Sequence, residues 1–559
     1  MIGVIAKPEE HAAASEFFEL FKTPWELYRD DGQYEVLLCA GGDEIPDRGA
    51  RLIVVYGGQR VPFDGHEKIG ILSEAKGPRM LSCNGGQIPI YGGNVTFENG
   101  AGVVVHEAAY RPGVVARIGY DLFREVRALL TRGQTAGNAS IPTLELHIAL
   151  LRHLIVESGV PLVEIPPVPD GHRFLACLTH DIDHPSLRWQ KFDHAVCGFL
   201  YRAIFGSLLR VIRGRLPARD LLRNWAAALK LPLVHLGLAR DIWQGFDRYV
   251  RLEGGLRSSF FVIPFKHCPG RSSRGAAPSR RASRYGASDI VVRIRELLSA
   301  GSEIGVHGID AWIDSSKGRA ELEQVRGITG RQDIGIRMHW LYFDEQSPAV
   351  LERAGFAYDS TVGYNETVGY RAGTPQAYKP LEAARLLELP MHIMDTALFF
   401  PCYLNLSPKK AREQVGQIIE NAVQFGGCVT VNWHDRSIFP ERLWGDFYLE
   451  LVDTLKSRGA WFSTTAEAAS WFRKRRSVVF EAVNWESGAV RVKIGVEISD
   501  DLPNLQLRVY NGQGLCQNTK ICEDISDHKA GLRMKHTFET RVTPTAREQM
   551  QKEQVRVQE

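Results

Sequence analysis

Short apolar runs alternate with stretches of helical periodicity through the middle of the chain, and this alternation predicts an α/β protein. The apolar runs that predict strands are residues 174–178, 259–264, 303–308, 334–339, 386–391 and 428–434. Helical patterns separate them, for example at 289–300 and 408–423. Polar residues recur where the predicted strands end, which is typical of a (β/α) barrel with its active site at the carboxyl ends of the strands.

The pattern changes on both sides of this region, so we expect four parts. Residues 1–170 predict an N-terminal α/β domain that ends in two helices and a proline-rich linker at 161–169. Residues 171–476 would form the barrel. Apolar residues alternate at 490–496 and 505–509, which predicts a small antiparallel β domain over 477–542. Residues 543–559 are charged and lack an apolar face, so we expect a disordered tail.

Composition narrows the class of protein. The chain has 559 residues, of which 44% are hydrophobic and 24% are charged, as in ordinary globular proteins. The net charge of +3 is too small to indicate a nucleic-acid partner. The nine cysteines are scattered singly, which argues against a thiolate zinc site or a disulfide framework. The N-terminus does not have the pattern of a signal peptide and no long apolar run is present, so we expect a cytoplasmic protein.

Two carboxylates follow the apolar run at 174–178. Asp181 and Asp183 lie on the same side of an extended chain. Two ionised carboxylates this close repel each other unless a cation or an arginine lies between them. Taken alone, the pair could also be a solvated acidic turn. The other polar residues at predicted strand ends are His307, Arg337, His339 and His434.

The order of these motifs resembles the polysaccharide deacetylase superfamily, the NodB-like domains of carbohydrate esterase family 4. The matching segments are residues 179–183, 260–262, 303–307, 354–361 and 431–434, together with Arg337. The resemblance covers about residues 172–475 and suggests a divergent, multidomain member. It implies a distorted (β/α) barrel and a metal-dependent hydrolase that removes an N-acetyl group from a sugar of a cell-surface polysaccharide or its precursor.

The resemblance also implies a role for individual residues. Asp181 would accept a proton from the attacking water, and Arg337 would keep Asp181 ionised. His434 would protonate the leaving amine. Asp183 and His307 would hold a divalent metal, for which zinc is the expected ion. Asp395 stands where the family has an aspartate that orients the catalytic histidine.

The chain departs from the family pattern at the third metal ligand. The family has a second histidine four residues after the first, and here Ala311 stands at that spacing from His307. We expect His339 to replace it, because His339 shares a strand face with Arg337. Asp310 is the alternative surrogate ligand. A degenerate site that holds no metal is the other interpretation.

Two further histidines stand on either side of the two carboxylates. His180 and His184 are expected to support the ligands or to contact substrate, although His184 could simply cap a turn. Two alternatives to the deacetylase remain open. One is a catalytically inactive, glycan-binding protein on the same fold, and the other is a hydrolase of a different amide.

Residues 198–216 predict an amphipathic helix, on which Arg202, Arg210 and Arg213 share one side. Such a helix could pack on the barrel. It could also lie on the inner membrane face as a peripheral contact, because arginines suit anionic headgroups. Residues 269–288 are rich in serine, arginine and glycine, so we expect a mobile loop there.

Overall fold

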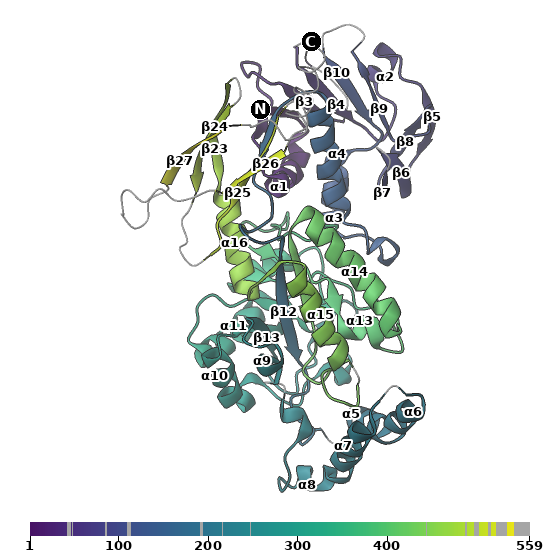
Figure 1. Ribbon diagram of the computed structural model, residues 1–559, viewed down its shortest axis with the longest axis vertical. Coiled ribbons are helices and arrows are strands. Elements are labelled where there is room, and N and C mark those ends of the chain that lie inside the picture. Colours follow the sequence, from purple (N-terminus) through teal and green to yellow (C-terminus); the bar gives the residue numbers. More distant parts are fainter. Residues whose placement is uncertain are drawn as a thin grey trace, which may run out of the picture. The chain divides into compact units, whose positions relative to one another are not determined.

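The computed structural model describes residues 1–41, 46, 49–83, 86–108, 113–190, 194–214, 216–245, 248–442, 444–486, 489–496, 502–511, 516–520 and 534–541. The chain divides into two compact units, shown in Figure 1. Unit 1 comprises Met1–Gly133, Pro142–Gly171 and Ser470–Glu559, and unit 2 comprises Gln134–Ile141 and His172–Ala469. The tail predicted at 543–559 lies outside the described residues. The division into four domains stays a prediction.

Unit 2 is built on one parallel sheet in the order β19-β18-β17-β16-β13-β12-β21-β20, with β22 beside β12. The strands are β12 (Phe174–Ile182), β13 (Ser258–Val262), β16 (Glu303–Gly308), β17 (Ile336–Met338), β18 (Tyr358–Asp359), β19 (Leu387–Glu388), β20 (Ile393–Met394), β21 (Cys428–Asn432) and β22 (Ala460–Phe462). Every residue of β12, β13 and β21 is buried. Such continuous apolar runs are expected of parallel strands that are covered on both faces.

The sheet curls into a distorted barrel because one short segment runs from the edge strand β19 to the opposite edge strand β20. The Leu389 N–H donates to the carbonyl of Asp359 in β18. A few residues later, the His392 N–H donates to the carbonyl of Thr430 in β21. The predicted distorted (β/α) barrel is therefore confirmed.

Helices surround this sheet, as Figure 1 shows for α10, α11, α14 and α15. The helices are α10 (Val291–Ser299), α11 (Ser315–Thr329), α12 (Ser347–Ala354), α13 (Asp395–Phe399), α14 (Pro408–Phe425) and α15 (Gly445–Ser457). Helix α16 (Thr465–Ser477) follows and continues into unit 1. Local sequence sets their ends. The Ser407 hydroxyl accepts a hydrogen bond from the Lys410 N–H at the start of α14, and Pro408 takes the first helical position. Gly355 ends α12 with a φ of 99°.

A helical insertion leaves the barrel between β12 and β13. It contains α5 (His194–Tyr201), a π-helical turn (Arg202–Gly206), α6 (Ser207–Ile212), α7 (Ala218–Leu229), α8 (Leu231–His235) and α9 (Arg248–Leu252). Helices α5 to α8 gather at one end of unit 2 in Figure 1. Phe199 and Ala203 are buried in a small core with Trp243 and Phe439. The described residues of 198–216 are thus largely helical, as predicted.

Unit 1 contains a six-stranded sheet in the order β2-β1-β3-β4-β10-β9, which is parallel except for β9. Its strands are β1 (Ile2–Ile5), β2 (Trp25–Leu27), β3 (Val36–Ala40), β4 (Leu52–Tyr56), β9 (Val103–Glu107) and β10 (Val114–Ile118). The helices of this part are α1 (His11–Phe21), α2 (Pro62–His66), α3 (Leu122–Thr131) and α4 (Thr143–Glu157). Two antiparallel pairs join β5 (Ile71–Ala75) to β8 (Asn94–Phe97) and β6 (Arg79–Cys83) to β7 (Gly86–Ile90). This confirms the predicted N-terminal α/β architecture.

The C-terminal region of unit 1 forms the predicted small antiparallel sheets. One contains β23 (Val479–Glu486), β24 (Ala489–Val496) and β27 (Met534–Arg541). The other joins β25 (Gln506–Tyr510) and β26 (Cys516–Lys520) to β11 (Leu162–Glu164). Strand β11 lies within the proline-rich segment that we expected to be a linker. Its three residues are not prolines, so their N–H groups are free to pair with β25.

Candidate active site

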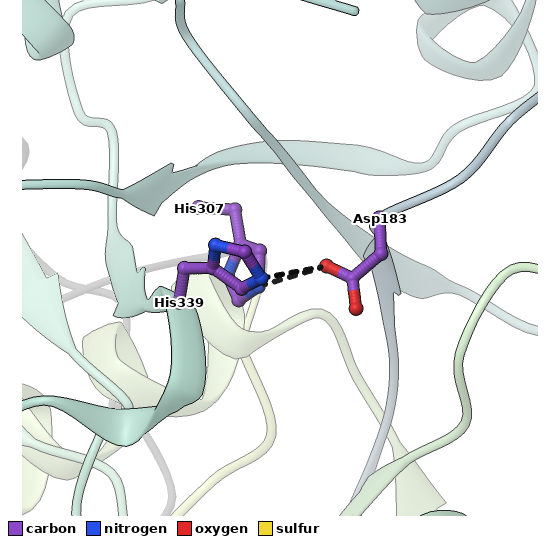
Figure 2. A group of neighbouring side chains, drawn as sticks. All are labelled: Asp183, His307 and His339. Atoms are coloured by element: carbon purple, nitrogen blue, oxygen red, sulfur yellow. Dashed lines mark ion pairs between the residues drawn. The ribbon is translucent and has the colours of Figure 1, made fainter. Parts of the chain in front are cut away.

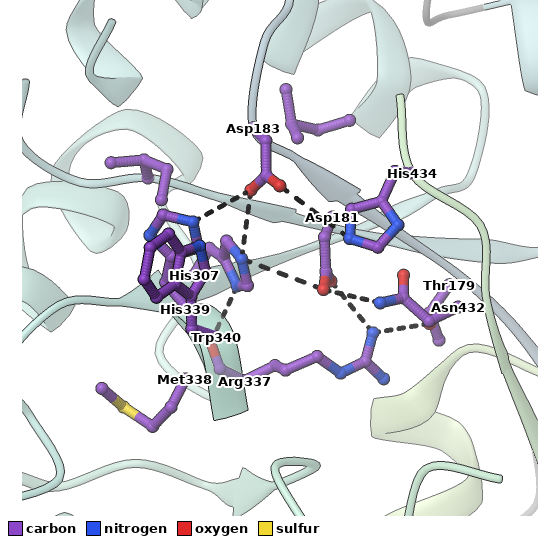
Figure 3. Close-up of polar contacts among 12 residues, drawn as sticks. Thr179, Asp181, Asp183, His307, Arg337, Met338, His339, Trp340, Asn432 and His434 are labelled. Atoms are coloured by element: carbon purple, nitrogen blue, oxygen red, sulfur yellow. Dashed lines mark hydrogen bonds and ion pairs between the residues drawn. The ribbon is translucent and has the colours of Figure 1, made fainter. Parts of the chain in front are cut away.

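Four strands end at one rim of the barrel and carry the predicted site residues there. Thr179 of β12 pairs with Asn432 of β21, and His307 of β16 pairs with Arg337 of β17. Because the strands are parallel, their carboxyl ends face the same side. The tertiary structure therefore assembles in one place residues that are up to 255 positions apart in the sequence (Figure 3).

Asp183, His307 and His339 form a compact group in which the imidazoles point at the carboxylate (Figure 2). One ligand atom from each residue lies within 4.8 Å of the other two. Asp183 Oδ1 is 3.3 Å from His307 Nε2 and 3.6 Å from His339 Nε2. His307 Nδ1 lies 3.0 Å from the Arg337 carbonyl oxygen. This contact favours a proton on Nδ1 and directs the lone pair of Nε2 toward Asp183.

The residues of this group fit a divalent metal. Asp183 Oδ1 is buried and has no hydrogen-bond partner among the described residues. A buried polar atom without a partner is unfavourable, and a cation between the carboxylate and the imidazoles would satisfy it. Burial lowers the pKa of His339 to about 3, so its imidazole is neutral, which is the form that binds metals. Two imidazoles and one carboxylate are a common ligand set for zinc.

Asp181 lies beside this group and is held by two donors (Figure 3). Arg337 Nη1 donates to Asp181 Oδ1 at 3.0 Å, and Asn432 Nδ2 donates to Oδ2 at 2.7 Å. Burial raises the pKa of Asp181, but His307 and then Arg337 oppose it, and the net effect lowers the pKa below its ordinary value. Asp181 is therefore an ionised carboxylate at neutral pH.

His434 follows β21 and pairs with the carboxylate of Asp395, the first residue of α13. His434 Nδ1 lies 2.6 Å from Asp395 Oδ1, and His434 Nε2 lies 3.8 Å from Asp183 Oδ2. Burial lowers the pKa of His434, but Asp395 and the two site carboxylates outweigh burial and raise it to about 9. His434 is therefore protonated at neutral pH and can act as a proton donor.

The remaining predicted residues lie in different surroundings. His180 is buried inside the barrel, where its Nε2 contacts the Glu253 carboxylate at 2.9 Å and its ring stacks on Tyr249. Its contacts are those of a structural residue. Asp310 lies apart from the metal group and binds the Lys317 ammonium at 2.6 Å. His184 lines the cavity described below.

Two residues that we did not predict support the site. Asn432 was detectable in principle, because it precedes His434 by two positions at the end of an apolar strand. Arg281 gave no signal in the sequence. Its guanidinium donates to the carbonyls of Pro269, Ile309 and His339. The segment that we expected to be a mobile loop is thus anchored to the barrel rim, where it contains the hairpin of β14 (Arg271–Ser272) and β15 (Gly275–Ala276).

The site opens into a cavity of about 490 Å³, a volume that suits a small ligand such as a sugar unit. Asp181, Asp183, His307, His339 and His434 all contribute to its lining. Aromatic side chains of Trp340, Tyr342, Phe400 and Tyr403 line it as well. Aromatic faces and convergent polar groups together are typical of a binding site for a polar organic molecule.

Comparison with solved structures finds similar chains. A Mycobacterium smegmatis protein described as a polysaccharide deacetylase is 20% identical, with 56% of this chain and 95% of that chain covered and a TM-score of 0.34. A PuuE allantoinase is 14% identical, with 55% of this chain and 92% of that chain covered and a TM-score of 0.33. A Pseudomonas aeruginosa PAO1 protein, also described as a polysaccharide deacetylase, is 13% identical, with 56% of this chain and 94% of that chain covered and a TM-score of 0.32.

Two of these three similar chains are described as polysaccharide deacetylases, and each of those two matches covers 56% of this chain. No protein-family model matches the sequence, and no curated protein matches it either. Among the described residues, every helix is too short or too polar to cross a bilayer.

Proposed function

We propose that the barrel is a metal-dependent hydrolase that removes an N-acetyl group from a sugar of a cell-surface polysaccharide or its precursor. One observation carries this proposal. A single cavity combines a candidate metal group with an ionised carboxylate, Asp181, and a protonated imidazole, His434. Metal-assisted hydrolysis of an amide uses these three components, because water must be activated and the amine must leave as a neutral group.

The ligands proposed are Asp183, His307 and His339, and the metal proposed is zinc. When bound, a divalent metal supplies Lewis acidity that polarises a carbonyl and makes water a better nucleophile. Asp181 accepts the proton of the water whose oxygen forms the new bond to the acetyl carbon. His434 donates its Nε2 proton to the nitrogen as the C–N bond breaks. The products are acetate and a free amino sugar.

Arg337 and Asp395 are positioning residues in this scheme. Arg337 is fully buried and also donates to Thr179 Oγ1 at 2.7 Å, so its guanidinium is fixed against Asp181. Asp395 accepts the His434 backbone N–H at 2.8 Å and faces its Nδ1, so it fixes both the ring and the proton on Nδ1. The Nε2 proton is then the one directed into the cavity.

The test is acetate release from N-acetylhexosamine oligomers, with and without a chelator. We expect turnover that the chelator removes and added zinc restores. Asp181→Asn should lower turnover by at least 10²-fold, because general base catalysis contributes about this much. Asp310→Asn is the matched control, since that carboxylate lies outside the metal group, and it should retain turnover.

Two results would contradict the proposal, and they separate its alternatives. Tight binding of the oligomers without any acetate release would indicate an inactive glycan-binding protein. Release of ammonia or amine from another amide, but of no acetate from N-acetyl sugars, would indicate a different amidohydrolase on the same fold.

We further propose that the protein works in the cytoplasm at the inner membrane face, and that the helical insertion touches lipid. Ten of the twenty large apolar side chains that the described residues expose belong to this insertion. They are Tyr201, Phe205, Leu208, Leu209, Ile212, Leu222, Leu229, Leu233, Leu236 and Leu238. A cluster of this kind marks an interaction surface, and nearby arginines such as Arg213 and Arg219 favour anionic headgroups.

Part of the face that we predicted to meet lipid is structural instead. Phe199 and Ala203 are buried, and Arg210 donates to the Glu441 carbonyl. The exposed residues therefore provide the better test. Wild-type protein should co-sediment with anionic vesicles, and Ile212→Ser with Leu229→Ser and Leu238→Ser should not. Equal sedimentation of both proteins would contradict a lipid contact. Concentration-dependent self-association that the same changes abolish would show that a second copy of the chain covers this surface instead of lipid.

A further inference from the structure

The cavity of the candidate site contains a buried arginine, Arg442, that forms no direct ion pair with a carboxylate of the described residues. Arg442 lines the cavity and is only 5% exposed. Its guanidinium lies over the Trp444 ring at 4.8 Å, and its Nε atom is buried without a hydrogen-bond partner among the described residues. No carboxylate of the described residues lies within ion-pair distance of it. A buried guanidinium in this state is costly unless an anion approaches it.

A second arginine reinforces the positive charge. Arg436 lines the same cavity, is half-buried and lies over the Trp243 ring at 5.2 Å. Burial, followed by Arg436 and Arg202, lowers the pKa of Arg442 well below its ordinary value. Glu441 and Asp395 act in the opposite direction on Arg442, and the Glu441 carboxylate also accepts a hydrogen bond from the Trp243 indole. Like charges gathered around a cavity are a common arrangement where a ligand supplies the opposite charge.

We propose that Arg442 and Arg436 bind a phosphate or diphosphate group carried by the N-acetylated sugar. This inference rests on the proposed function for the sugar, and it names the substrate class as phosphorylated glycan precursors. Two guanidinium groups match a phosphate better than a carboxylate. Phosphate carries close to two negative charges and can accept paired N–H bonds from each planar fork.

The position of the two arginines supports this assignment. Both belong to the chain that follows β21, and Arg436 comes two residues after His434. An anionic group held there would lie on the side of the cavity from which His434 reaches the substrate. The cavity of about 490 Å³ has room for a hexosamine with one phosphate. The diphosphate could come from a nucleoside diphosphate sugar or from a lipid diphosphate sugar.

The test is calorimetric binding to the full chain in the presence of a chelator, so that a bound metal cannot attract the phosphate. The probes are N-acetylglucosamine and N-acetylglucosamine 1-phosphate. We expect wild-type protein to bind the phosphorylated sugar at least tenfold more tightly. Arg442→Gln should remove this preference, and Arg436→Gln should reduce it. Arg331→Gln, which changes an exposed arginine outside the cavity, should retain the preference.

The outcomes separate this inference from the proposed function. Equal affinity of the wild type for both probes, or an equal loss in Arg331→Gln, would overturn the phosphate site and leave deacetylation untouched. A preference that depends on Arg442, without acetate release from any sugar, would uphold the phosphate site and overturn the deacetylase. If Arg442→Gln fails to fold, the binding preference of Arg436→Gln tests the phosphate site instead. Arg436 is only half-buried, so we expect this variant to fold.

The two sources of diphosphate are distinguished in a second arm. Acetate release is compared for uridine diphosphate N-acetylglucosamine and for a short prenyl diphosphate N-acetylglucosamine. Faster acetate release from either of the two diphosphate sugars supports recognition of the diphosphate, provided that Arg442→Gln lowers the rate with that sugar at least tenfold. Turnover of both that is unaffected by Arg442→Gln would contradict the assignment.

Discussion

His434 Nδ1 lies 2.6 Å from Asp395 Oδ1, and the backbone N–H of His434 donates to the other oxygen of the same carboxylate. One buried aspartate thus holds both the main chain and the ring of the proposed proton donor. Burial raises the pKa of Asp395, but His434 reverses this and lowers it below its ordinary value. The two residues therefore form a charged pair inside the protein, and the pair should be measurable through its pH dependence.

The first prediction concerns the stability of metal-free protein against pH. The pKa of His434 is raised from 6.5 to about 9, so its contribution to stability is full below pH 6.5 and is lost as the pH rises through about 9. Such a shift corresponds to roughly 3 kcal/mol, at about 1.4 kcal/mol per pKa unit. The difference in Tm between wild type and Asp395→Asn should therefore be largest near pH 6 and shrink toward pH 10. Asp453→Asn, an exposed carboxylate on α15, should show no such trend.

The second prediction divides the roles of the two carboxylates. Asp183→Asn should lose bound metal, because Asp183 supplies the oxygen that faces both imidazoles. Asp181→Asn should retain metal and lose turnover, because Asp181 binds Arg337 and Asn432 instead. Metal content after dialysis, measured by elemental analysis, distinguishes them. Equal metal content in the two variants would show that this division is wrong.

The third prediction concerns the buried pair of Arg337 and Asp181. Arg337→Met should destabilise unit 2 by about 3–5 kcal/mol, because it leaves Asp181 as an uncompensated buried charge. Adding Asp181→Asn should recover a large part of this loss, since the remaining side chain is neutral. Urea unfolding of both single variants and the double variant gives the coupling energy. Additive losses would mean that the two side chains do not interact as described.

The fourth prediction concerns the anchor of the third candidate ligand. Arg281 donates to the His339 carbonyl at 2.8 Å and to the Pro269 carbonyl at 2.6 Å. Arg281→Gln should weaken zinc binding by about 10-fold or more, as loss of a ligand-supporting contact does. It should also speed proteolysis within 269–288. Arg280→Gln, the exposed neighbour, is the control, and a matching loss of zinc there would argue against a specific anchor.

Much of the barrel could be predicted from local sequence. The runs that became β12, β13, β16 and β21 are apolar and short, and this pattern reflects burial on both sheet faces. The helix signals were similarly local, as with Pro408 after Ser407 and Gly355 after α12. Asp181, Asp183 and His307 could be singled out because they follow such runs directly.

The proline-rich segment shows where local reasoning reached its limit. Prolines at 161, 166, 167 and 169 indicated a linker, yet Leu162–Glu164 between them forms β11. The strand exists because it pairs with β25, which is more than 300 residues away in the sequence. Pairing over such a distance leaves no periodic signal within the segment itself.

The sequence by itself determined which strands end in acids, imidazoles and an arginine, because burial of a parallel strand dictates an apolar run and the polar residues stand where that run ends. It favoured His339 over Asp310 as the residue that joins Asp183 and His307, but local sequence could not place either side chain. Only the tertiary structure showed which side chain lies beside Asp183, because β17 lies beside β16, so that His339 faces Asp183 while Asp310 turns to Lys317. It alone also brought Arg442 and Arg436 to the cavity, because spatial charge clustering depends on how distant segments pack and not on their order along the chain.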